Sequence, residues 1–494
     1  MGFMDWFKSK PTAAPKKRRY EAAHPSRVAG GFSLGGELDI MERLKGDLKG
    51  LIKHSRQQSE NNDYIKAFHA MCKRHIVGPK NIRLQSRARK NGDWKGPLDQ
   101  IANAEIEFHW KEWCKRQNCS IDGKMDWQLL CELGLTSTAR DGNVMYRKFQ
   151  GAQFGKYGYQ LQVLEIDHLD FELNQTLNNG GKIVMGVELN SFDRVVNYHM
   201  FRDHPGNYGP GHSRERIVVP ADKILHVFRP ERPGQILGVP WSYTALRRLN
   251  MLNGYETAAL TNARAGASKM GFIEPGEEDD GAIDPDDADE METTESGAIV
   301  EDLEPGTVER LNPGEKFTGF DPAYPNGEIE TFIKVMLRGA AAGLGVSYHG
   351  LANDLSGANF STLRQGTNEE RDEWRMLQGW LANDLHDQVA ADVLRMSILT
   401  GNINLPFSKF DQFNVREWKG RGWQAVNPAQ EASAHERNLQ NKLTSPQDVV
   451  AESGQDLDEI YEKFELASEM AATHKLFLPF EKPNESGEKK QSKD

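Results

Sequence analysis

Cysteine is scarce in this sequence. The 494-residue chain contains only four cysteines, and they show no spacing typical of a disulfide framework, so we expect reduced thiols. A zinc site is not expected, because the one local cluster of metal-binding residue types has no second pair at zinc-finger spacing. The cysteines are Cys72, Cys114, Cys119 and Cys131, and the cluster is His69, Cys72 and His75.

Long apolar runs are missing as well. No stretch approaches the about 18 consecutive apolar residues of a membrane span, so no membrane segment is expected. Residues 16–19 form a basic cluster near the start, but no apolar signal core follows, and secretion is not expected. Apolar residues still make up 38% of the chain, with ten Trp and 22 Phe. This length and composition predict a protein of several subdomains.

One segment has no positive charge. Lys and Arg are absent between Lys269 and Arg310, whereas sixteen acidic residues lie from Glu274 to Glu309. The whole chain has a net charge of −11, yet removing these sixteen from its 72 acids leaves 56 against 61 bases, a net +5. A single acidic insertion therefore sits in a mildly basic protein, which indicates two surfaces with different partners.

The motifs of common enzyme classes are absent. We find no Walker loop, no G-x-S-x-G elbow and no dinucleotide fingerprint. Residues 284–295 have the length of an EF-hand loop, but Ala288 occupies a ligand position and Asp289 the position of the required glycine, which favours a solvated acidic loop. We expect no catalytic residues, no bound metal and no cofactor.

Periodicity and turn residues predict a mixed α+β fold. Helix is expected over 37–76, with a polar break at 59–63, and over 101–113. Short antiparallel strands are expected between Asn143 and Phe228. Helices over 240–269 and 328–343 flank the acidic insertion. A capping-box pattern at Thr367–Glu370 predicts the start of a helix that reaches Gly401, and a helical region follows over 428–475.

The segment Ile224–Pro240, ILHVFRPERPGQILGVP, resembles the signature of lambda-type bacteriophage portal proteins. The resemblance continues through Leu249–Lys269 and through Gly343–Ser361, GLGVSYHGLANDLSGANFS. It also covers Trp110, Asp141-Gly142-Asn143, Leu164–Asp167, Trp418 and Asn427-Pro428, so that it extends over about residues 20–475.

This resemblance implies a portal-type α+β subunit with wing, stem, clip and crown. It implies a dodecameric ring in the virion, assembled in the host cytoplasm. Partners would be double-stranded DNA, terminase, a head-tail connector or adaptor, and the major capsid protein. The implied division is a flexible arm (1–36), wing and core (37–239), first stem helix (240–270), acidic clip (271–326), second stem helix (327–345), tunnel loop (346–366), long helix and core (367–427), helical crown (428–475) and disordered tail (476–494).

Two sets of site residues follow. The tunnel loop would face DNA with Leu351, Asn353, Asp354, Leu355, Ser356, Gly357, Asn359 and Ser361. The clip would dock protein partners with Glu277, Glu278, Asp279, Asp280, Asp284, Asp286, Asp287, Asp289 and Glu290. The β-prone residues available for pairing with a neighbouring clip are Ile299, Val300, Val308, Leu311 and Phe317.

Two other functions remain open from the residues alone. One is a packaging-associated nuclease, which would need carboxylates clustered on a folded core. The other is a non-viral scaffold with an acidic interaction loop.

Overall fold

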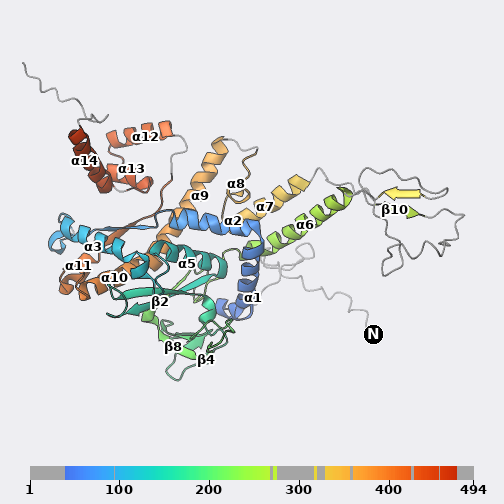
Figure 1. Cartoon of the computed structure of the whole chain (residues 1–494), viewed down its shortest axis with the longest axis horizontal. Coiled ribbons are helices and arrows are strands. Elements are labelled where there is room, and N and C mark those ends of the chain that lie inside the picture. Colours follow the sequence, from blue (N-terminus) through green and yellow to red (C-terminus); the bar gives the residue numbers. More distant parts are fainter. Residues whose placement is uncertain are drawn as a thin grey trace, which may run out of the picture.

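The computed structural model describes residues 39–93, 95–267, 271–274, 316–319, 329–356, 360–423, 428–455 and 457–474. In Figure 1 the helices and sheets form a central body, from which helices α6 and α7 project to one side. A separate group of helices, α12–α14, lies above the other end of the body. The expected α+β fold is confirmed.

Two helices begin the described chain and meet at the predicted polar break. They are α1 (Ile40–Asn61) and α2 (Asp63–Cys72), continued by a π-turn at Lys73–Val77. The backbone of Asn62 is extended, and its side-chain oxygen accepts hydrogen bonds from the amides of Tyr64 and Ile65. Asn62 therefore ends one helix and caps the next.

The strands form antiparallel sheets, as expected, but they divide into two main sheets. The first has the order β3-β2-β9, with β2 at Asn143–Gln150, β3 at Tyr159–Leu164 and β9 at Ile224–Phe228. The second has the order β4-β5-β6-β7-β8, with bounds Gln175–Thr176, Lys182–Val184, Val187–Leu189, Val195–Phe201 and Arg216–Pro220. All these strands lie within the range 143–228 that was expected to hold short strands, and β4 and β5 span only two and three residues.

A cluster of tryptophans forms the centre of the main core. Trp110 and Trp113 lie on α3 (Gln100–Trp113), and Trp127 begins α5 (Trp127–Asp141). The rings of Trp110 and Trp113 stack with centroids 5.3 Å apart, and Trp113 donates from its indole nitrogen to the Tyr159 carbonyl at 2.9 Å. All three tryptophans are buried and anchor the core.

Helix α5 was not predicted from the sequence. Most of its positions are buried, including small and polar ones, so it lacks the polar stripe that reveals a surface helix. It ends at Gly142 in the left-handed conformation.

The helices on either side of the acidic insertion are α6 (Tyr243–Ala267) and α7 (Ile329–Leu344). Between them, β10 (Gly271–Glu274) pairs antiparallel with β11 (Lys316–Gly319). The helix expected over 240–269 would have had Pro240 in its first turn, but α6 begins three residues later, at Tyr243.

The predicted helix start at Thr367 is wrong. Helix α9 runs from Phe360 to Leu381, so Thr367–Glu370 lies inside it. Thr367 and Glu370 are therefore interior positions of the helix and cap no end, and the adjacent Glu369 accepts a hydrogen bond from the Gln365 side chain one turn earlier, at 2.8 Å.

The remaining elements complete the body and the separate helical group. A π-turn at Ala382–His386 joins α9 to α10 (Asp387–Leu399). Strand β1 (Arg83–Ser86) pairs antiparallel with β12 (Arg416–Lys419). The other helices are α4 (Arg116–Cys119), α8 (Tyr348–Ala352), α11 (Phe410–Phe413), α12 (Pro428–Gln440), α13 (Pro446–Glu452) and α14 (Leu457–His474). Short 3₁₀ turns lie at Lys90–Gly92, Ile166–His168, Ala221–Lys223 and Phe407–Lys409.

Candidate functional site

Part of the loop that was expected over 346–366 is helical, because α8 spans Tyr348–Ala352 and α9 begins at Phe360. Helix α7 ends at Gly345, which has a positive φ of 69°. Ser347 then caps the short helix α8, where its hydroxyl accepts from the Gly350 amide at 3.1 Å. After Ala352, the described residues of this segment form only a short turn at 353–356.

Asp354 organises this turn. Its carboxylate accepts hydrogen bonds from the Tyr348 hydroxyl at 2.7 Å and from the Ser356 amide and hydroxyl at 2.8 and 2.5 Å. The His349 ring nitrogen Nδ1 lies 2.6 Å from the Asp354 carbonyl oxygen. The bonds from Ser356 and Tyr348 hold the pKa of the Asp354 carboxyl well below its usual range.

Lys334, from the facing side of α7, brings a positive charge to the turn. Its Nζ lies 3.6 Å from the Asp354 carboxylate and 3.3 Å from the Ser356 hydroxyl, and it also pairs with Glu330 at 2.6 Å. The hydrogen bond to Glu330 raises the pKa of Lys334. No pattern in the sequence indicated this residue, because Lys334 and Asp354 are twenty positions apart and only packing brings them together.

The predicted tunnel-loop residues differ in exposure. Leu355 is 67% exposed, and Asn353 adopts the left-handed conformation at the end of α8. Leu351 is only 3% exposed and packs in the core, so its expected place facing the channel is wrong. Ser361 lies within α9, not in a loop. Gly357 and Asn359 lie outside the described residues.

Helices α6 and α7 pack closely at the end near the body. The Thr244 hydroxyl donates to the Gly343 carbonyl at 2.8 Å, and Gly339 leaves room for the Arg248 guanidinium. Farther along, the rings of Tyr255 and Phe332 lie 4.9 Å apart. Large apolar side chains nevertheless remain exposed on both helices, namely Met251, Leu260, Phe332 and Val335.

Only the base of the acidic insertion belongs to the described chain. Strand pairing there joins Ile273 to Phe317 within one chain, and the expected pairing of Phe317 with a neighbouring subunit stays a prediction. The nine acidic residues expected to dock partners, from Glu277 to Glu290, lie outside the described residues, as do the arm at 1–36 and the tail at 476–494.

A buried carboxylate, Asp141, links α1 to α5. Its side chain is fully buried and accepts paired hydrogen bonds from the guanidiniums of Arg56, at 2.9 and 2.8 Å, and Arg140, at 2.9 and 2.7 Å. Burial alone would lower the pKa of Arg56, but hydrogen bonds to Asp141 and Asp167 outweigh burial and raise it. Arg140 also pairs with Glu165 at 2.9 Å.

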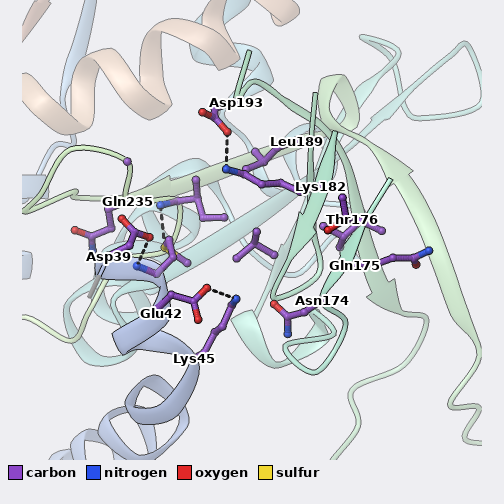
Figure 2. A pocket seen from close by; sticks show the side chains of 15 residues that line it. Asp39, Glu42, Lys45, Asn174, Gln175, Thr176, Lys182, Leu189, Asp193 and Gln235 are labelled. Atoms are coloured by element: carbon purple, nitrogen blue, oxygen red, sulfur yellow. Dashed lines mark hydrogen bonds and ion pairs between the residues drawn. The ribbon is translucent and has the colours of Figure 1, made fainter. Parts of the chain in front are cut away.

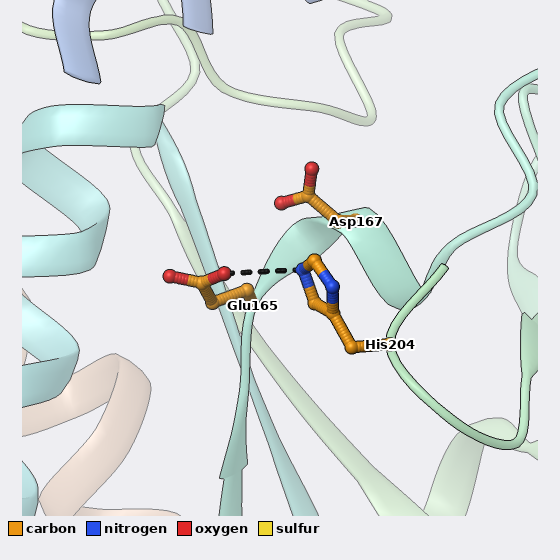
Figure 3. Close-up of side chains that lie close together, drawn as sticks. All are labelled: Glu165, Asp167 and His204. Atoms are coloured by element: carbon orange, nitrogen blue, oxygen red, sulfur yellow. Dashed lines mark ion pairs between the residues drawn. The ribbon is translucent and has the colours of Figure 1, made fainter. Parts of the chain in front are cut away.

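Glu165, Asp167 and His204 lie close enough to offer ligand atoms to one metal ion (Figure 3). His204 Nε2 is 3.2 Å from a Glu165 carboxylate oxygen. The two carboxylates, however, already neutralise Arg56 and Arg140, and Arg56 contacts Asp167 directly. This arrangement is better suited to an ion-pair network than to a cation site.

A cavity of about 680 Å³ lies between the start of α1 and the edge of the second sheet (Figure 2). Asp39, Glu42 and Lys45 line one wall, and the ion pair of Lys182 with Asp193 at 2.8 Å lies on the opposite wall. Its lining contains no convergent set of catalytic groups among the residues that the structure describes. In the same part of the chain, no helix is both long and apolar enough to cross a membrane.

Comparison with known proteins gives consistent results. The family model described as "Phage portal protein, lambda family" matches residues 37–378. A probable portal protein of Halomonas phage phiHAP-1 is 31% identical over 448 residues, covering 90% of this chain and 85% of that protein. The portal protein of Escherichia phage N15 is 23% identical (91% and 90% covered), and portal protein B of Escherichia phage lambda is 24% identical (81% and 80% covered).

Among solved structures, this chain is similar to a chain in the neck of an empty GTA particle computed with C6 symmetry. The TM-score is 0.45 with 13% identity, covering 83% of this chain and 93% of that chain. A chain from the neck of the native GTA particle computed with C12 symmetry gives a TM-score of 0.41 with 12% identity, covering 81% and 91%. Because both TM-scores are below 0.5, these similarities do not indicate how the subunits assemble.

Proposed function

Because this chain belongs to the lambda family of phage portal proteins, and so is a structural subunit of the portal vertex, we propose that its copies close into a ring of twelve around duplex DNA. Each interface would be heterologous, with one face of a subunit against a different face of the next, closed by rotation. The genome would enter and leave through the central channel.

The observation that carries this proposal is the arrangement of α6, the acidic insertion and α7. The chain runs out along α6, turns at the β10–β11 pair and returns along α7 (Figure 1). We assign these helices to the stem and residues 271–326 to the clip. The apolar side chains that α6 and α7 leave exposed would then be covered by the neighbouring stems.

The remaining parts are assigned accordingly. Residues 37–239 form the wing, whose outer surface would contact the major capsid protein. We assign residues 346–366 to the tunnel loop, whose described part includes α8 and the turn at 353–356, and residues 428–475 to the crown. We assign the acidic residues of the clip to docking terminase during packaging and a head-tail connector afterwards.

A channel must let DNA slide. Each phosphate neutralised by Lys or Arg releases counterions and adds affinity, so a strongly basic lining would hold the duplex. The turn at 353–356 has the suitable chemistry, because the charge of Lys334 is opposed by Asp354 and Glu330. Short polar groups such as Asn353 and Ser356 can touch phosphates without anchoring them.

Electron microscopy of the purified chain tests the assembly. We expect rings with a central hole, together with a closed oligomer in native mass spectrometry. Monomers at every salt and protein concentration would contradict the proposal.

We further propose that the subunit has no catalytic activity of its own. Incubation with ATP, duplex DNA and Mg²⁺ should release no phosphate and nick no DNA. Turnover that survives further purification and is lost in the Asp286→Asn, Asp287→Asn variant would favour the nuclease instead.

A further inference from the structure

Three arginines gather around one tryptophan beside α9, and a fourth arginine, Arg74, lies close by. Arg371 and Arg375 come from α9, and their guanidinium carbons lie 5.9 and 5.4 Å from the ring centroid of Trp423. Arg421 lies 5.9 Å from the same ring. Arg421 also donates to the Arg74 carbonyl at 2.7 Å, which links the π-turn after α2 to the group. We call Arg74, Arg371, Arg375 and Arg421 the arginine cluster.

His75 holds the group together without adding charge. Its ring stacks on Trp374 with centroids 5.2 Å apart and on Trp423 with centroids 6.2 Å apart. Its Nδ1 lies 3.2 Å from Trp423 Nε1 and 3.3 Å from Arg421 Nη1, so it accepts from these donors. Burial lowers the pKa of His75 to about 4. The ring is therefore neutral at pH 7.

Two acids lie near the four arginines: Glu431, whose charge opposes that of Arg371, and Asp372, so the cluster keeps an excess of positive charge. The charged groups that lower the pKa of His75 are Arg421, Arg74 and Arg371. Burial and then the charges of Arg74 and Arg371 also lower the pKa of Arg421. At the outer edge Arg375 pairs with Asp372 at 2.7 Å, but both side chains are more than half exposed, and such pairs are weak.

We propose that the arginine cluster binds the phosphate backbone of duplex DNA. Guanidinium groups match phosphate geometry with two parallel hydrogen bonds, which makes a group of arginines a suitable phosphate site. Arg74 and Arg375 are exposed and able to reach a ligand. Arg371 and Arg421 are half-buried and add positive electrostatic potential to the site behind them.

The geometry favours backbone contact over base recognition. Three guanidiniums already lie near the Trp423 ring, and His75 stacks on it, so its faces are not open for a base. Binding would therefore be independent of sequence and sensitive to salt. That behaviour suits a channel, because screened contacts retain DNA loosely and still permit sliding.

The position agrees with this role. The segment that carries Trp423 runs between α9 and the helical group α12–α14, where Gly422 packs against the backbone of Ser453 and Gly454. This inference rests on the proposed function, which passes duplex DNA through a central channel and assigns 428–475, with α12–α14, to the crown. The cluster would then contact the duplex loosely at the level of the crown, on the far side of the tunnel loop from the clip.

The test is binding of a fluorescein-labelled 20-base-pair duplex to the full-length protein, measured by anisotropy from 50 to 300 mM KCl. The test variant is Arg74→Gln, Arg375→Gln, which removes two exposed charges and spares Arg421. The matched control is Arg116→Gln, Arg232→Gln, two exposed arginines outside the cluster. If each cluster arginine contacts one phosphate, the slope of log K against log salt should fall by about 2 in the test variant. The control should keep the wild-type slope.

Affinity at 100 mM KCl should fall about tenfold or more in the test variant alone. An unchanged slope and affinity would overturn the inference, as would failure of the wild-type protein to bind duplex DNA. A poly-glutamate peptide of equal charge that binds as tightly, through the same arginines, would identify a carboxylate-bearing protein partner instead. Ring formation is scored separately by imaging, so loss of this site is distinguishable from failure of the portal assembly.

Discussion

At Asp141 a single buried carboxylate accepts hydrogen bonds from two arginines, one from α1 and one from its own helix α5. Removing one partner from a buried ion pair costs far more than the pair contributes, because the remaining charge stays desolvated. The adjoining residue, Gly142, is equally constrained, since its backbone has a φ of 82° and lies against residues 238–239.

Gly142 therefore provides a prediction at the residue scale. A Cβ there would lie 2.4 Å from the Val239 carbonyl carbon. Gly142→Ala should combine left-handed strain with this clash and reduce the free energy of unfolding by about 3 kcal/mol. Gly401 is the matched control, because it has a similar φ of 74° but nothing within 4 Å of its Cβ position. Gly401→Ala should cost only about 1 kcal/mol. If urea unfolding shows the same loss of unfolding free energy in Gly142→Ala and Gly401→Ala, the close approach of Gly142 to Val239 does not contribute to the cost.

His386 gives a prediction that depends on pH. This histidine is fully buried near Trp127 and Trp418, and burial lowers its pKa to about 3. The unfolded chain binds a proton near pH 6.5 while the folded chain does not, so the stability that neutral His386 contributes is present above pH 6.5 and is lost as pH falls toward 3. As pH falls from 6.5 to 5, the free energy of unfolding of His386→Phe should therefore decrease by about 2 kcal/mol less than that of the wild type.

The exposed His54 supplies the control for this measurement. Urea unfolding of His54→Gln should follow the wild-type pH dependence. A His386→Phe protein with the same pH dependence as the wild type would mean that His386 is protonated in the fold.

At the scale of elements, the turn between α8 and α9 depends on one acidic side chain. Asp354→Asn would replace an acceptor that binds Tyr348 and Ser356 and would leave Lys334 without that opposing charge. We expect faster amide hydrogen exchange at 353–356, with α5 and its core unchanged.

The control for the turn is Asp193→Asn, which breaks a surface pair with Lys182 in a different hairpin. Its exchange at 353–356 should equal that of the wild type. Unaltered exchange there in Asp354→Asn would mean that the backbone alone sets the turn.

At the scale of the whole molecule, the acidic insertion can be separated from ring formation. Deleting 277–295 removes much of the negative charge but neither stem helix nor the strand pair that closes the insertion. We expect normal rings that bind terminase or the connector less well, with the largest loss at low ionic strength, because charge steering is screened by salt. Surface plasmon resonance at two salt concentrations measures this. Undiminished partner binding would leave the segment with a solubilising role only.

Sequence alone predicted the features that depend on neighbouring residues. The break at Asn62, the helices that flank the acidic insertion and the antiparallel strands between 143 and 228 follow from capping groups and from hydrophobic period. The segregation of acids is a property of composition and needed no structure. Helix α5 was missed because burial on most sides removes the period by which a helix is recognised.

The tertiary structure alone decided which distant charges meet. Lys334 opposes Asp354, Arg56 and Arg140 share Asp141, and the arginine cluster joins positions 74, 371 and 421. The tertiary fold also buried Leu351, which the sequence had placed in the channel. Local patterns fix backbone conformation over a few residues, whereas the pairing of side chains far apart in sequence depends on how completed elements pack, and no local pattern records that packing.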